Sequence, residues 1–454
     1  MTGAPTRTDG WVADRFGVTL HTDDSPIGWQ LPDLVGVALR KNPRRAHLLV
    51  SSWLGKHVPV APDLIRASGQ LLGLLVAESL GATMPGLRDA ADALRGGDAG
   101  PVAALTAGLR PTVATSVFGF AETATGLGHC VAEVLLPAVY LHSTRREIDG
   151  VPVALRFEEG HSHATAHLAQ PHPGGLLTSD DVLVLVDDEL STGTTAMAAI
   201  TALQQVAPRR RYVVAALVDL RSTVDTTTLH AYAAQHGVEI TVVALASGRV
   251  DLPAGLTGAA AAFIAAHPAP ETGFAAAPHM TRVVLPWPAE LPEGGRHGIR
   301  AVEAAALDAA VAAAVSPLAA ALPTGVTRVL VVGTEEFMYL PLRLAEALSR
   351  PGRSIRFQTT TRSPVHPEAD AGYPVRRAFR FAGPEGDTDA PRHLYNADWT
   401  GGDPDAIVIV LDAAADTPAL HAPDGLLAAL GTIGVPLVVA VVPGADPGTL
   451  GTRR

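Results

Sequence analysis

The chain has 454 residues, enough for two domains of ordinary size, each with its own core. Its formal net charge of −11 and its scattered arginines argue against a nucleic-acid partner, because binding a phosphate backbone requires a basic face. Cys130 is the only cysteine, which excludes an internal disulfide framework and a cysteine-rich zinc site and fits the reducing cytoplasm.

Short apolar runs typical of strands alternate with longer helical patterns in the first half of the chain, and this alternation predicts an α/β fold. The runs are apolar throughout, so they fit a parallel sheet covered by helices on both faces, with ligands at the carboxyl ends of the strands. The expected strands are 47–52, 115–120, 181–188, 211–220 and 239–246, and the expected helices are 63–80, 128–136, 195–206 and 228–237.

A stretch rich in Ala, Pro and Gly interrupts this pattern, after which a second α/β pattern begins. We therefore expect domains at 1–255 and 282–454, joined by a linker region at 256–281. The apolar tract 301–322 contains charged residues and a proline, so we expect a helix there and no membrane span. The other elements expected in the second domain are strands at 327–333, 354–361, 406–412 and 436–442 and a helix at about 339–350.

The stretch LVLVDDELSTGTT, residues 183–195, ends an apolar run in two adjacent carboxylates, Asp187 and Asp188. A polar ligand at the strand ends would offset the cost of burying them, and paired carboxylates can accept hydrogen bonds from vicinal hydroxyls. The following turn offers backbone N–H groups, hydroxyls and a helix N-terminus, all suited to a phosphate monoester. Diol plus phosphate indicates ribose 5-phosphate, although an acidic strand end before a capped helix is the plainer alternative.

Four apolar residues, DD, three variable positions and TGTT resemble the phosphoribosyl pyrophosphate (PRPP) motif of type I phosphoribosyltransferases. That resemblance implies a Rossmann-like parallel sheet with a hood and a flexible loop. It also implies that the acidic pair holds the ribose hydroxyls while the loop holds the 5-phosphate. The PRPP-binding residues implied in this way are Asp187, Asp188, Ser191, Thr192, Gly193, Thr194 and Thr195.

Two further stretches resemble parts of orotate-type enzymes of that class. Residues 119–135, GFAETATGLGHCVAEVL, resemble the strand, loop and helix that receive pyrophosphate. The next strand, YLHSTRRE, makes Arg145 and Arg146 pyrophosphate candidates, although an arginine pair at a strand end is otherwise an ordinary solvated surface. The resemblance implies a pyrophosphate loop formed by Glu122, Thr123, Ala124 and Thr125.

Residues 147 to about 178 correspond to the flexible loop and contain His161, His163 and His167. A His-x-His pair places both rings on one face of a strand, which suggests a metal site, but no clear fourth ligand accompanies it. We predict instead a lid that brings His161 or His163 to the pyrophosphate, with a solvent-exposed loop as the alternative. Lys56, one of two lysines among 34 basic residues, is expected to reach the site from the hood; a surface role is its alternative.

Nearly the full chain resembles a narrower family, the orotate-type phosphoribosyltransferase-like proteins with a C-terminal TRSP domain, encoded in tellurium-resistance-type stress clusters. Thr361, Arg362, Ser363 and Pro364 spell the motif that names this domain, and the stretches 333–348 and 296–298 fit it as well. Thr361, Arg362 and Ser363 follow an expected strand, so they form either a second site for a phosphate or carboxylate or a structural loop.

The resemblance implies an enzyme that transfers ribose 5-phosphate from PRPP to a nitrogenous base or related acceptor and releases pyrophosphate, in synthesis of a nucleotide-like stress metabolite. Mg²⁺ is expected mainly on PRPP, and no protein ligand is assigned to it; Arg145, Arg146 and Lys56 would add fixed positive charge. We expect a cytoplasmic protein with a small-molecule acceptor, no nucleic-acid or membrane partner, a homodimeric state and biosynthetic partner proteins. The alternative is a PRPP-binding regulator or scaffold without turnover.

Overall fold

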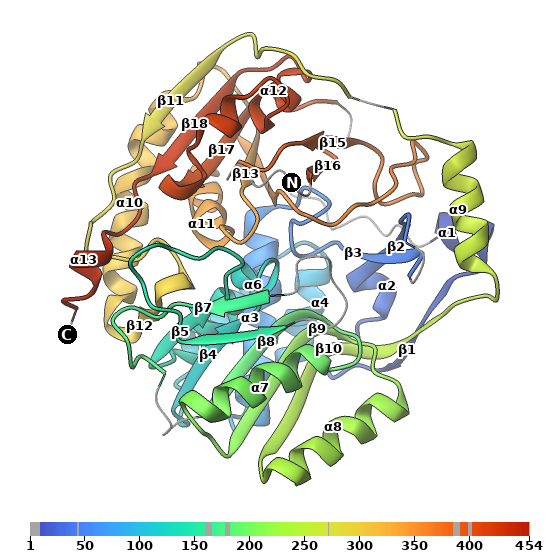
Figure 1. Cartoon of the computed structure of the whole chain (residues 1–454), viewed down its shortest axis with the longest axis vertical. Coiled ribbons are helices and arrows are strands. Elements are labelled where there is room, and N and C mark those ends of the chain that lie inside the picture. The colour runs from blue at the N-terminus through green and yellow to red at the C-terminus, as the bar shows by residue number, and fades with distance from the viewer. Residues whose placement is uncertain are drawn as a thin grey trace.

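A computed structural model of the chain describes residues 10–42, 45–158, 166–177, 182–270, 272–384, 391–397 and 402–453. Two sheets dominate the described residues, one in each half of the chain, and helices lie against the faces of both (Figure 1). This architecture confirms the α/β fold class expected from apolar strands that alternate with helices.

The first sheet has seven strands in the order β1-β10-β9-β8-β4-β5-β12. The five central strands are parallel, and the two edge strands are antiparallel to their neighbours. In Figure 1, α7 and α8 lie in front of this sheet and α3 and α6 lie behind it. The bounds are β1 (Thr19–Asp24), β4 (Thr115–Gly119), β5 (Val139–His142), β8 (Val182–Leu190), β9 (Arg211–Asp219), β10 (Glu239–Asp251), β12 (Ile299–Arg300), α3 (Pro62–Ser79), α6 (Ala124–Leu135), α7 (Thr194–Val206) and α8 (Thr223–His236).

Smaller elements complete the first half of the chain. The strand expected at 47–52 forms as β3, but it pairs with β2 in a separate hairpin and does not join the central sheet. A short apolar run has the same pattern in a buried hairpin as in a parallel strand, so periodicity alone could not separate the two. These elements are α1 (Gly10–Phe16), α2 (Leu31–Leu34), β2 (Val35–Leu39), β3 (His47–Ser51), α4 (Leu87–Arg95), α5 (Gly100–Gly108), β6 (Leu155–Glu158) and β7 (Ala166–Ala169).

The region expected to be a linker, 256–281, contains regular structure. Helix α9 (Leu256–Ala266) packs on α1, where the rings of Trp11 and Phe263 lie 5.4 Å apart, and β11 begins at Met280. Further along, β12 pairs with β5 and extends the first sheet. The second half of the chain therefore contributes a strand to the sheet of the first half.

The second sheet has five parallel strands in the order β11-β18-β17-β13-β14. Its long helix α10 is apolar and long enough to cross a membrane by length and composition, and its buried side chains pack against α11 and β11. The bounds are β11 (Met280–Val284), α10 (Ala304–Ala321), β13 (Arg328–Gly333), α11 (Tyr339–Leu348), β14 (Ser354–Thr359), β15 (Ala378–Phe381), β16 (Arg392–Tyr395), β17 (Ala406–Asp412), α12 (Leu426–Gly431), β18 (Leu437–Val442), α13 (Pro447–Leu450) and the 3₁₀ turns Gly295–His297, Ala301–Glu303, Ala413–Ala415 and Pro418–His421.

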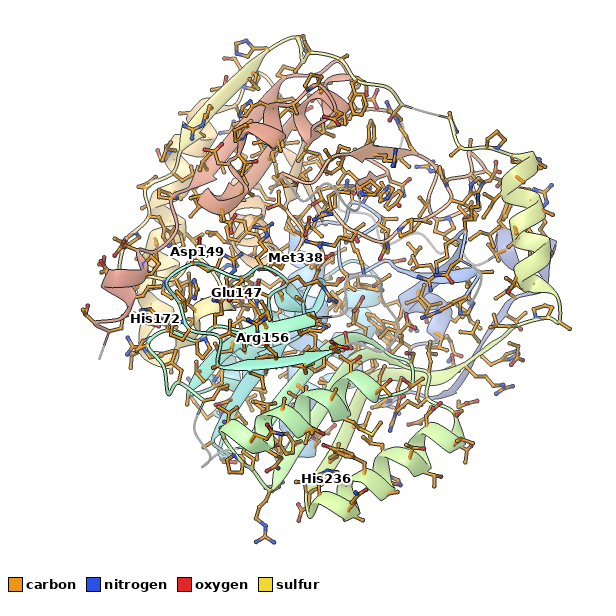
Figure 2. All side chains as sticks on the ribbon, viewed as in Figure 1. Glu147, Asp149, Arg156, His172, His236 and Met338 are labelled. Atoms are coloured by element: carbon orange, nitrogen blue, oxygen red, sulfur yellow. The ribbon has the colours of Figure 1, made fainter. Side chains whose placement is uncertain are left out.

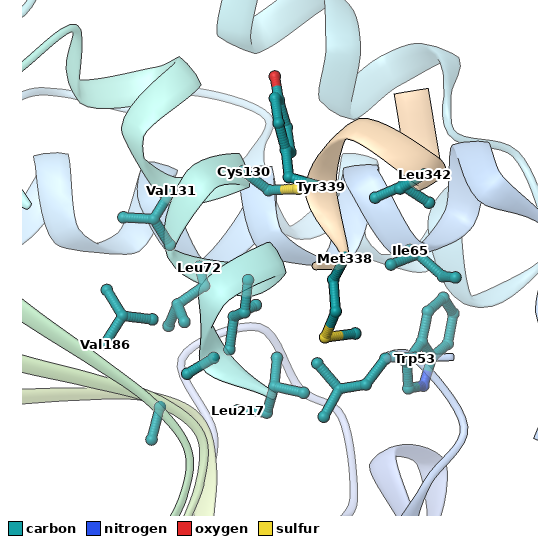
Figure 3. Packing of buried hydrophobic residues seen from close by; sticks show 14 of the residues in the cluster. Trp53, Ile65, Leu72, Cys130, Val131, Val186, Leu217, Met338, Tyr339 and Leu342 are labelled. Atoms are coloured by element: carbon teal, nitrogen blue, oxygen red, sulfur yellow. The ribbon is translucent and has the colours of Figure 1, made fainter. Parts of the chain in front are cut away.

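One apolar core continues from the first half of the chain into the second. Met338 and Tyr339, where α11 begins, pack with Leu72 and Cys130 in the same buried cluster (Figure 3). A Cβ atom on Gly126 would lie 3.1 Å from the Cβ of Met338, so glycine lets α6 approach this residue closely. Met338 lies near the centre of the molecule (Figure 2). Burial of this apolar surface stabilises the docking of the two halves.

Candidate functional site at the carboxyl edge of the first sheet

The acidic pair lies at the carboxyl end of β8. Residues 182–186 are buried, whereas Asp187 and Asp188 are half-buried, because the strand leaves the core at this point. Strand β8 continues to Leu190, two residues beyond the predicted strand end. The backbone N–H of Asp188 donates to Oδ1 of Asp187 over 2.9 Å. The pair therefore sits where a parallel sheet places its ligand.

The hydroxyl-rich turn after β8 leads directly into α7. Gly193 caps the helix at a φ of +83°, a left-handed conformation that glycine adopts without a steric penalty. The hydroxyls of Thr192 and Thr194 lie 2.5 Å apart beside the helix N-terminus. The first N–H groups of a helix have no partner within it, so this turn has the chemistry of an anion cradle. Ser191 and Thr195 are half-buried on either side of it.

The predicted pyrophosphate loop lies beside β8. It follows β4, and Phe120, two residues before the loop, donates its backbone N–H to the carbonyl of Val186 over 3.0 Å. The peptide bond between Ala121 and Glu122 is cis, and α6 begins at Ala124. The structure thus brings the loop 122–125 and the acidic pair to one edge of one sheet. Thr123 is buried, and Thr125 donates its hydroxyl to the carbonyl of Glu336 in the second domain over 2.8 Å.

Arg145 and Arg146 do not share one environment. Arg145 lies against the loop, with Nη2 3.4 Å from the carbonyl of Ala121 and 3.4 Å from Nε2 of His167. Arg146 instead turns to the second domain, where its Nη1 lies 3.4 Å from Oδ1 of Asp412. Arg145 therefore lies against the predicted pyrophosphate loop, whereas Arg146 faces the second domain, and the pyrophosphate contact of each stays a prediction. Adjacent residues at a strand end point to opposite sides, which separates the pair.

His167 lies inside the predicted flexible loop but is buried. Its Nδ1 is 2.8 Å from the hydroxyl of Ser143, which accepts the backbone N–H of Ala121. Its ring stacks on Phe157 of β6 at a centroid distance of 4.6 Å. His161 and His163 lie outside the described residues, so their predicted role stays a prediction. Among the residues that are described, no group of three His, Cys, Asp or Glu side chains could hold a metal ion.

Two basic side chains from the N-terminal part of the chain, where the hood was expected, reach the acidic end of β8. Lys56 places Nζ 3.6 Å from Oδ2 of Asp188, and Arg45 donates from Nη2 to Oε1 of Glu189 over 2.6 Å. Lys56 therefore lies beside the acidic pair, and its role at the site stays a prediction. Arg45 and Glu189 were not singled out in the sequence, although Glu189 directly follows the acidic pair.

Arg221 is a second residue that the motif search missed. It follows β9, the neighbour of β8, and its guanidinium makes two hydrogen bonds to Asp219 at 2.9 and 2.7 Å. Its buried Nη1 has no hydrogen-bond partner within the part of the chain that the structure describes. A Cβ atom on Gly193 would lie 3.7 Å from its Cδ, and Arg221 also lines a cavity of about 330 Å³. The rule that ligands bind at strand ends could have identified it.

The second domain contributes Arg362 to the loop. Nε of Arg362 lies 2.9 Å from Oε1 of Glu122 and donates to Oε2 of Glu335 over 3.0 Å. Glu335 also pairs with the buried Arg392. Burial, followed by the charge of Glu335, raises the pKa of the Glu122 carboxyl. The ionised form of Glu122 is therefore stabilised by the positive charges around it, of which Arg362 contributes most.

Thr361 and Ser363 have local structural contacts. The backbone of Thr361 exchanges two hydrogen bonds with His393, and its hydroxyl accepts the backbone N–H of Ser363 over 3.1 Å. The carbonyl of Ser363 accepts a hydrogen bond from the hydroxyl of Tyr395. Of the three residues proposed as a second site, only Arg362 turns to an ionic partner in the first domain. The loop alternative describes Thr361 and Ser363 better.

Glu336 is the centre of a buried ionic cluster between the domains. Its carboxylate accepts the hydroxyl of Thr144 over 2.7 Å, the backbone N–H of Arg145 over 3.1 Å and Nη2 of Arg296 over 2.9 Å. Arg296 also lies 3.0 Å from Asp412. Burial opposes ionisation of Glu336, but the nearby Arg296 and Arg146 outweigh it and lower its pKa to about 2. This carboxylate is therefore charged at neutral pH.

Comparison with known proteins identifies both domains. Residues 34–249 match the family described as phosphoribosyl transferase, and residues 293–430 match the family described as TRSP domain C terminus to PRTase_2. No curated protein sequence matches the chain.

Among solved structures, parts of the chain are similar to adenine phosphoribosyltransferases. The Trypanosoma brucei enzyme, in complex with AMP, pyrophosphate and ribose-5-phosphate, is 19% identical, with 29% of this chain and 55% of that chain covered and a TM-score of 0.23. This chain thus spans about half the length of the trypanosome enzyme. The Giardia lamblia enzyme is 22% identical, with 31% and 75% covered and a TM-score of 0.22. The Saccharomyces cerevisiae enzyme is 18% identical, with 36% and 80% covered and a TM-score of 0.23.

These likenesses are local, since each covers about a third of this chain or less. The two family matches, by contrast, lie in the order expected from the TGTT and TRSP motifs. The chain therefore contains a phosphoribosyl transferase domain at residues 34–249, followed by a TRSP domain at residues 293–430.

Proposed function

We propose that the enzyme transfers ribose 5-phosphate from PRPP to a nitrogenous base or related acceptor and releases pyrophosphate. The observation that carries this proposal is the convergence of the acidic pair at 187–188, the turn 191–195 and the loop 122–125 on one edge of the first sheet. Each of these segments matches one part of PRPP: the ribose hydroxyls, the 5-phosphate and the pyrophosphate.

Three groups of the chain have defined tasks in this proposal. Asp187 and Asp188 orient the ribose, and the N-terminus of α7 holds the 5-phosphate. Arg145 and Lys56 supply positive charge where the bond from C1 to pyrophosphate breaks and negative charge accumulates on the leaving oxygen. Closure of the predicted lid, residues 147 to about 178, to which β6 and β7 belong, would exclude water, which would otherwise hydrolyse PRPP. On β6, Arg156 pairs with Glu147 over 2.9 Å at the start of this lid (Figure 2).

The oxygen-rich site fits Mg²⁺ bound together with PRPP. Mg²⁺ prefers oxygen ligands and commonly takes one or two carboxylates plus substrate phosphates. The half-buried carboxylates of Asp187 and Asp188 are donors of this kind. A magnesium ion bound there would neutralise charge on the leaving pyrophosphate.

For the acceptor we propose the cavity of about 330 Å³ that Asp219 and Arg221, at the end of β9, help to line. Its polar lining includes Asp24, Glu78, Ser79 and Arg221. The buried Nη1 donor of Arg221 has no partner among the described residues, so an acceptor carbonyl or carboxylate there would satisfy it. Arg221→Gln is expected to raise KM for the acceptor at least tenfold and to change KM for PRPP little.

The proposal is tested by pyrophosphate release from PRPP and Mg²⁺ across a panel of purine, pyrimidine and pyridine acceptors. Release that depends on one acceptor class, and that falls at least a hundredfold in Asp187→Asn/Asp188→Asn, would support the transferase and name its acceptor. Asp403→Asn is the matched control, because Asp403 forms an exposed ion pair with Arg377 in the other domain. It should retain full activity.

Other outcomes would favour different functions. PRPP binding without release for any acceptor would favour the regulator or scaffold alternative. Absence of PRPP binding in calorimetry would contradict the proposal. If the product proves to be nucleotide-like, the expected role in synthesis of a stress metabolite becomes the next hypothesis to examine.

A further inference from the structure

The two domains meet through the carboxyl edges of their sheets. Loops that follow β4 and β5 in the first sheet contact loops that follow β13, β14 and β17 in the second. Ligands of open parallel sheets bind at such edges, so both natural ligand crevices face the same space. In the second sheet the crevice between β13 and β17 holds Arg296, which pairs with Glu336 and Asp412. Protein side chains therefore occupy the position of a ligand there.

The buried ionic cluster around Glu336 is not required to hold the two domains together. Met338 and Tyr339 already anchor the second domain in a shared apolar core. A buried ion pair gains little over well-packed apolar residues, because removing charges from water costs about as much as their attraction returns. Charged side chains at this edge therefore need another explanation. Their partners in the first domain, Glu122, Thr125, Thr144 and Arg145, belong to or adjoin the pyrophosphate loop.

Glu122 poses an electrostatic problem for this loop. Its carboxylate lies at the entrance to α6, where a dianionic or trianionic pyrophosphate group would be bound. Two like charges in a poorly hydrated site repel strongly, so the loop needs a compensating cation at Glu122. Arg362 supplies that cation at 2.9 Å, and Glu335 binds the same guanidinium through Nε over 3.0 Å and lies 2.9 Å from Nη2. The side chain of Arg362 is 18% exposed, so solvent screens this pair only weakly.

Glu336 fixes the neighbouring part of the same pocket. Its backbone carbonyl and carboxylate accept hydrogen bonds from Thr125, Thr144 and the backbone N–H of Arg145. One residue of the second domain thereby ties α6 to the loop after β5 and orients Arg145. Glu336 is 3% exposed, so these bonds are shielded from water.

From these contacts we infer that the TRSP domain is a working part of the transferase site: Arg362 and Glu336 are positioning residues that shape and neutralise the pyrophosphate pocket. This inference rests on the proposed function and deepens it. It assigns the second domain no separate reaction. The arginine of the TRSP motif acts through Glu122, and the two glutamates after β13 hold Arg362 and the loop in place.

The test is a series of single and double variants at Arg362 and Glu122. Steady-state kinetics with PRPP and calorimetry measure their effects. Arg362→Gln should raise KM for PRPP at least tenfold with a smaller fall in kcat, because Glu122 is left uncompensated beside the pyrophosphate. Arg362→Lys, which keeps the charge, should lie between this variant and the wild type. Glu122→Gln added to Arg362→Gln should restore KM to within about threefold of the wild type. Arg377→Gln, at a half-buried arginine of the same domain whose ionic partner is Asp403, is the matched control and should leave KM unchanged.

A purely structural role predicts a different pattern. Arg362→Gln would then lower the unfolding midpoint without a specific rise in KM, and Glu122→Gln would not rescue it. Either an unchanged KM in Arg362→Gln or a double variant no better than the single one would overturn the inference.

Inorganic pyrophosphate is the second probe, since it needs only the shared pocket. If the wild type fails to bind PRPP, the proposed function fails. Pyrophosphate binding that is weakened by Arg362→Gln and regained in the double variant would then still support the shared pocket. Equal pyrophosphate binding by the wild type and Arg362→Gln, or binding by neither, would count against it.

Discussion

The carboxyl edges of the two sheets use the same geometry for opposite purposes. At the end of β8 in the first sheet, Asp187, Asp188 and Glu189 are half-buried. At the ends of β13 and β17 in the second sheet, Glu335, Glu336 and Asp412 are 2–3% exposed. The first edge keeps polar groups accessible to a ligand, whereas the second edge is closed by arginines of the same chain.

The difference shows that a polar strand end in a parallel sheet marks a place for a partner but does not say which partner. For β8 the partner proposed here is a substrate. For β13 and β17 it is Arg296 and Arg146, which lie on other segments of the chain. Changes at Glu336 and Asp412 should therefore affect stability more than changes at Asp187 and Asp188, which should mainly affect binding.

The largest stability effect is expected from Glu336→Ala. Removal of this carboxylate leaves Arg296 and Arg146 buried with less negative charge around them, which should lower the free energy of unfolding by about 3–5 kcal/mol. Chemical denaturation measures this loss. Asp403→Ala, which breaks an exposed pair with Arg377, should cost about 1 kcal/mol or less. Equal effects of the two changes would refute the contrast between the edges.

Acid should have the next largest effect on stability. Burial lowers the pKa of His142 and of His297 to about 4, well below the value of about 6.5 in an unfolded chain. Between these values the unfolded chain binds more protons than the folded one, so the free energy of unfolding decreases as pH falls below 6.5. The two residues together should cost about 2–4 kcal/mol by pH 5.

Urea denaturation at pH 7.5, 6.0 and 5.0 measures this slope. His142→Gln should make the slope shallower, whereas His230→Gln, an exposed histidine on α8, should not change it. A free energy of unfolding that stays constant from pH 7.5 to pH 5 would show that these histidines become protonated without cost.

At the first edge, Gly193→Ala should lower stability by about 1–2 kcal/mol, because alanine must adopt the left-handed conformation at φ +83°. Space is not the limit, since the nearest atom to the new Cβ is 3.7 Å away. Gly258→Ala in α9, where nothing lies within 4 Å, should instead stabilise the chain by about 0.5–1 kcal/mol. Thermal unfolding of the two variants should thus shift in opposite directions.

The smallest stability effect is expected from Asp188→Asn. Its partner Lys56 lies 3.6 Å away in a partly exposed pair, so the loss should stay below about 1 kcal/mol. PRPP affinity, measured by calorimetry, should nevertheless fall at least tenfold. If Asp188→Asn lost stability but bound PRPP normally, Asp188 would have a structural role and the proposed contrast between the two edges would be wrong.

The sequence predicted more of the fold than of the site contacts. Wholly apolar strands followed by helices fixed the α/β class, and the TGTT and TRSP motifs fixed the order of the two domains. The structure brings Asp187, Glu122, Arg145 and Lys56 to one edge of the first sheet, and their roles there stay predictions. Hairpin β2–β3 and helix α9 were missed, because neither has a periodicity that separates it from a central strand or a linker.

Residue pairing between distant segments could not be predicted. Arg146 was grouped with Arg145 because the two are adjacent, yet it faces Asp412, 266 positions further along the chain. Arg362 was assigned to a second site, yet it lies against Glu122 of the first domain. Local sequence patterns do not reveal which strand end of the first sheet contacts which strand end of the second, because those contacts depend on how the two sheets dock.

The sequence by itself determined which residues end strands and which carry phosphate-binding chemistry, because strand patterns and turn composition act over a few neighbouring residues. Only the tertiary structure decided that the ends of both sheets face one another. Docking is driven by the apolar core around Met338 and Tyr339, which is assembled from both halves of the chain. That packing places the TRSP arginine beside the pyrophosphate loop.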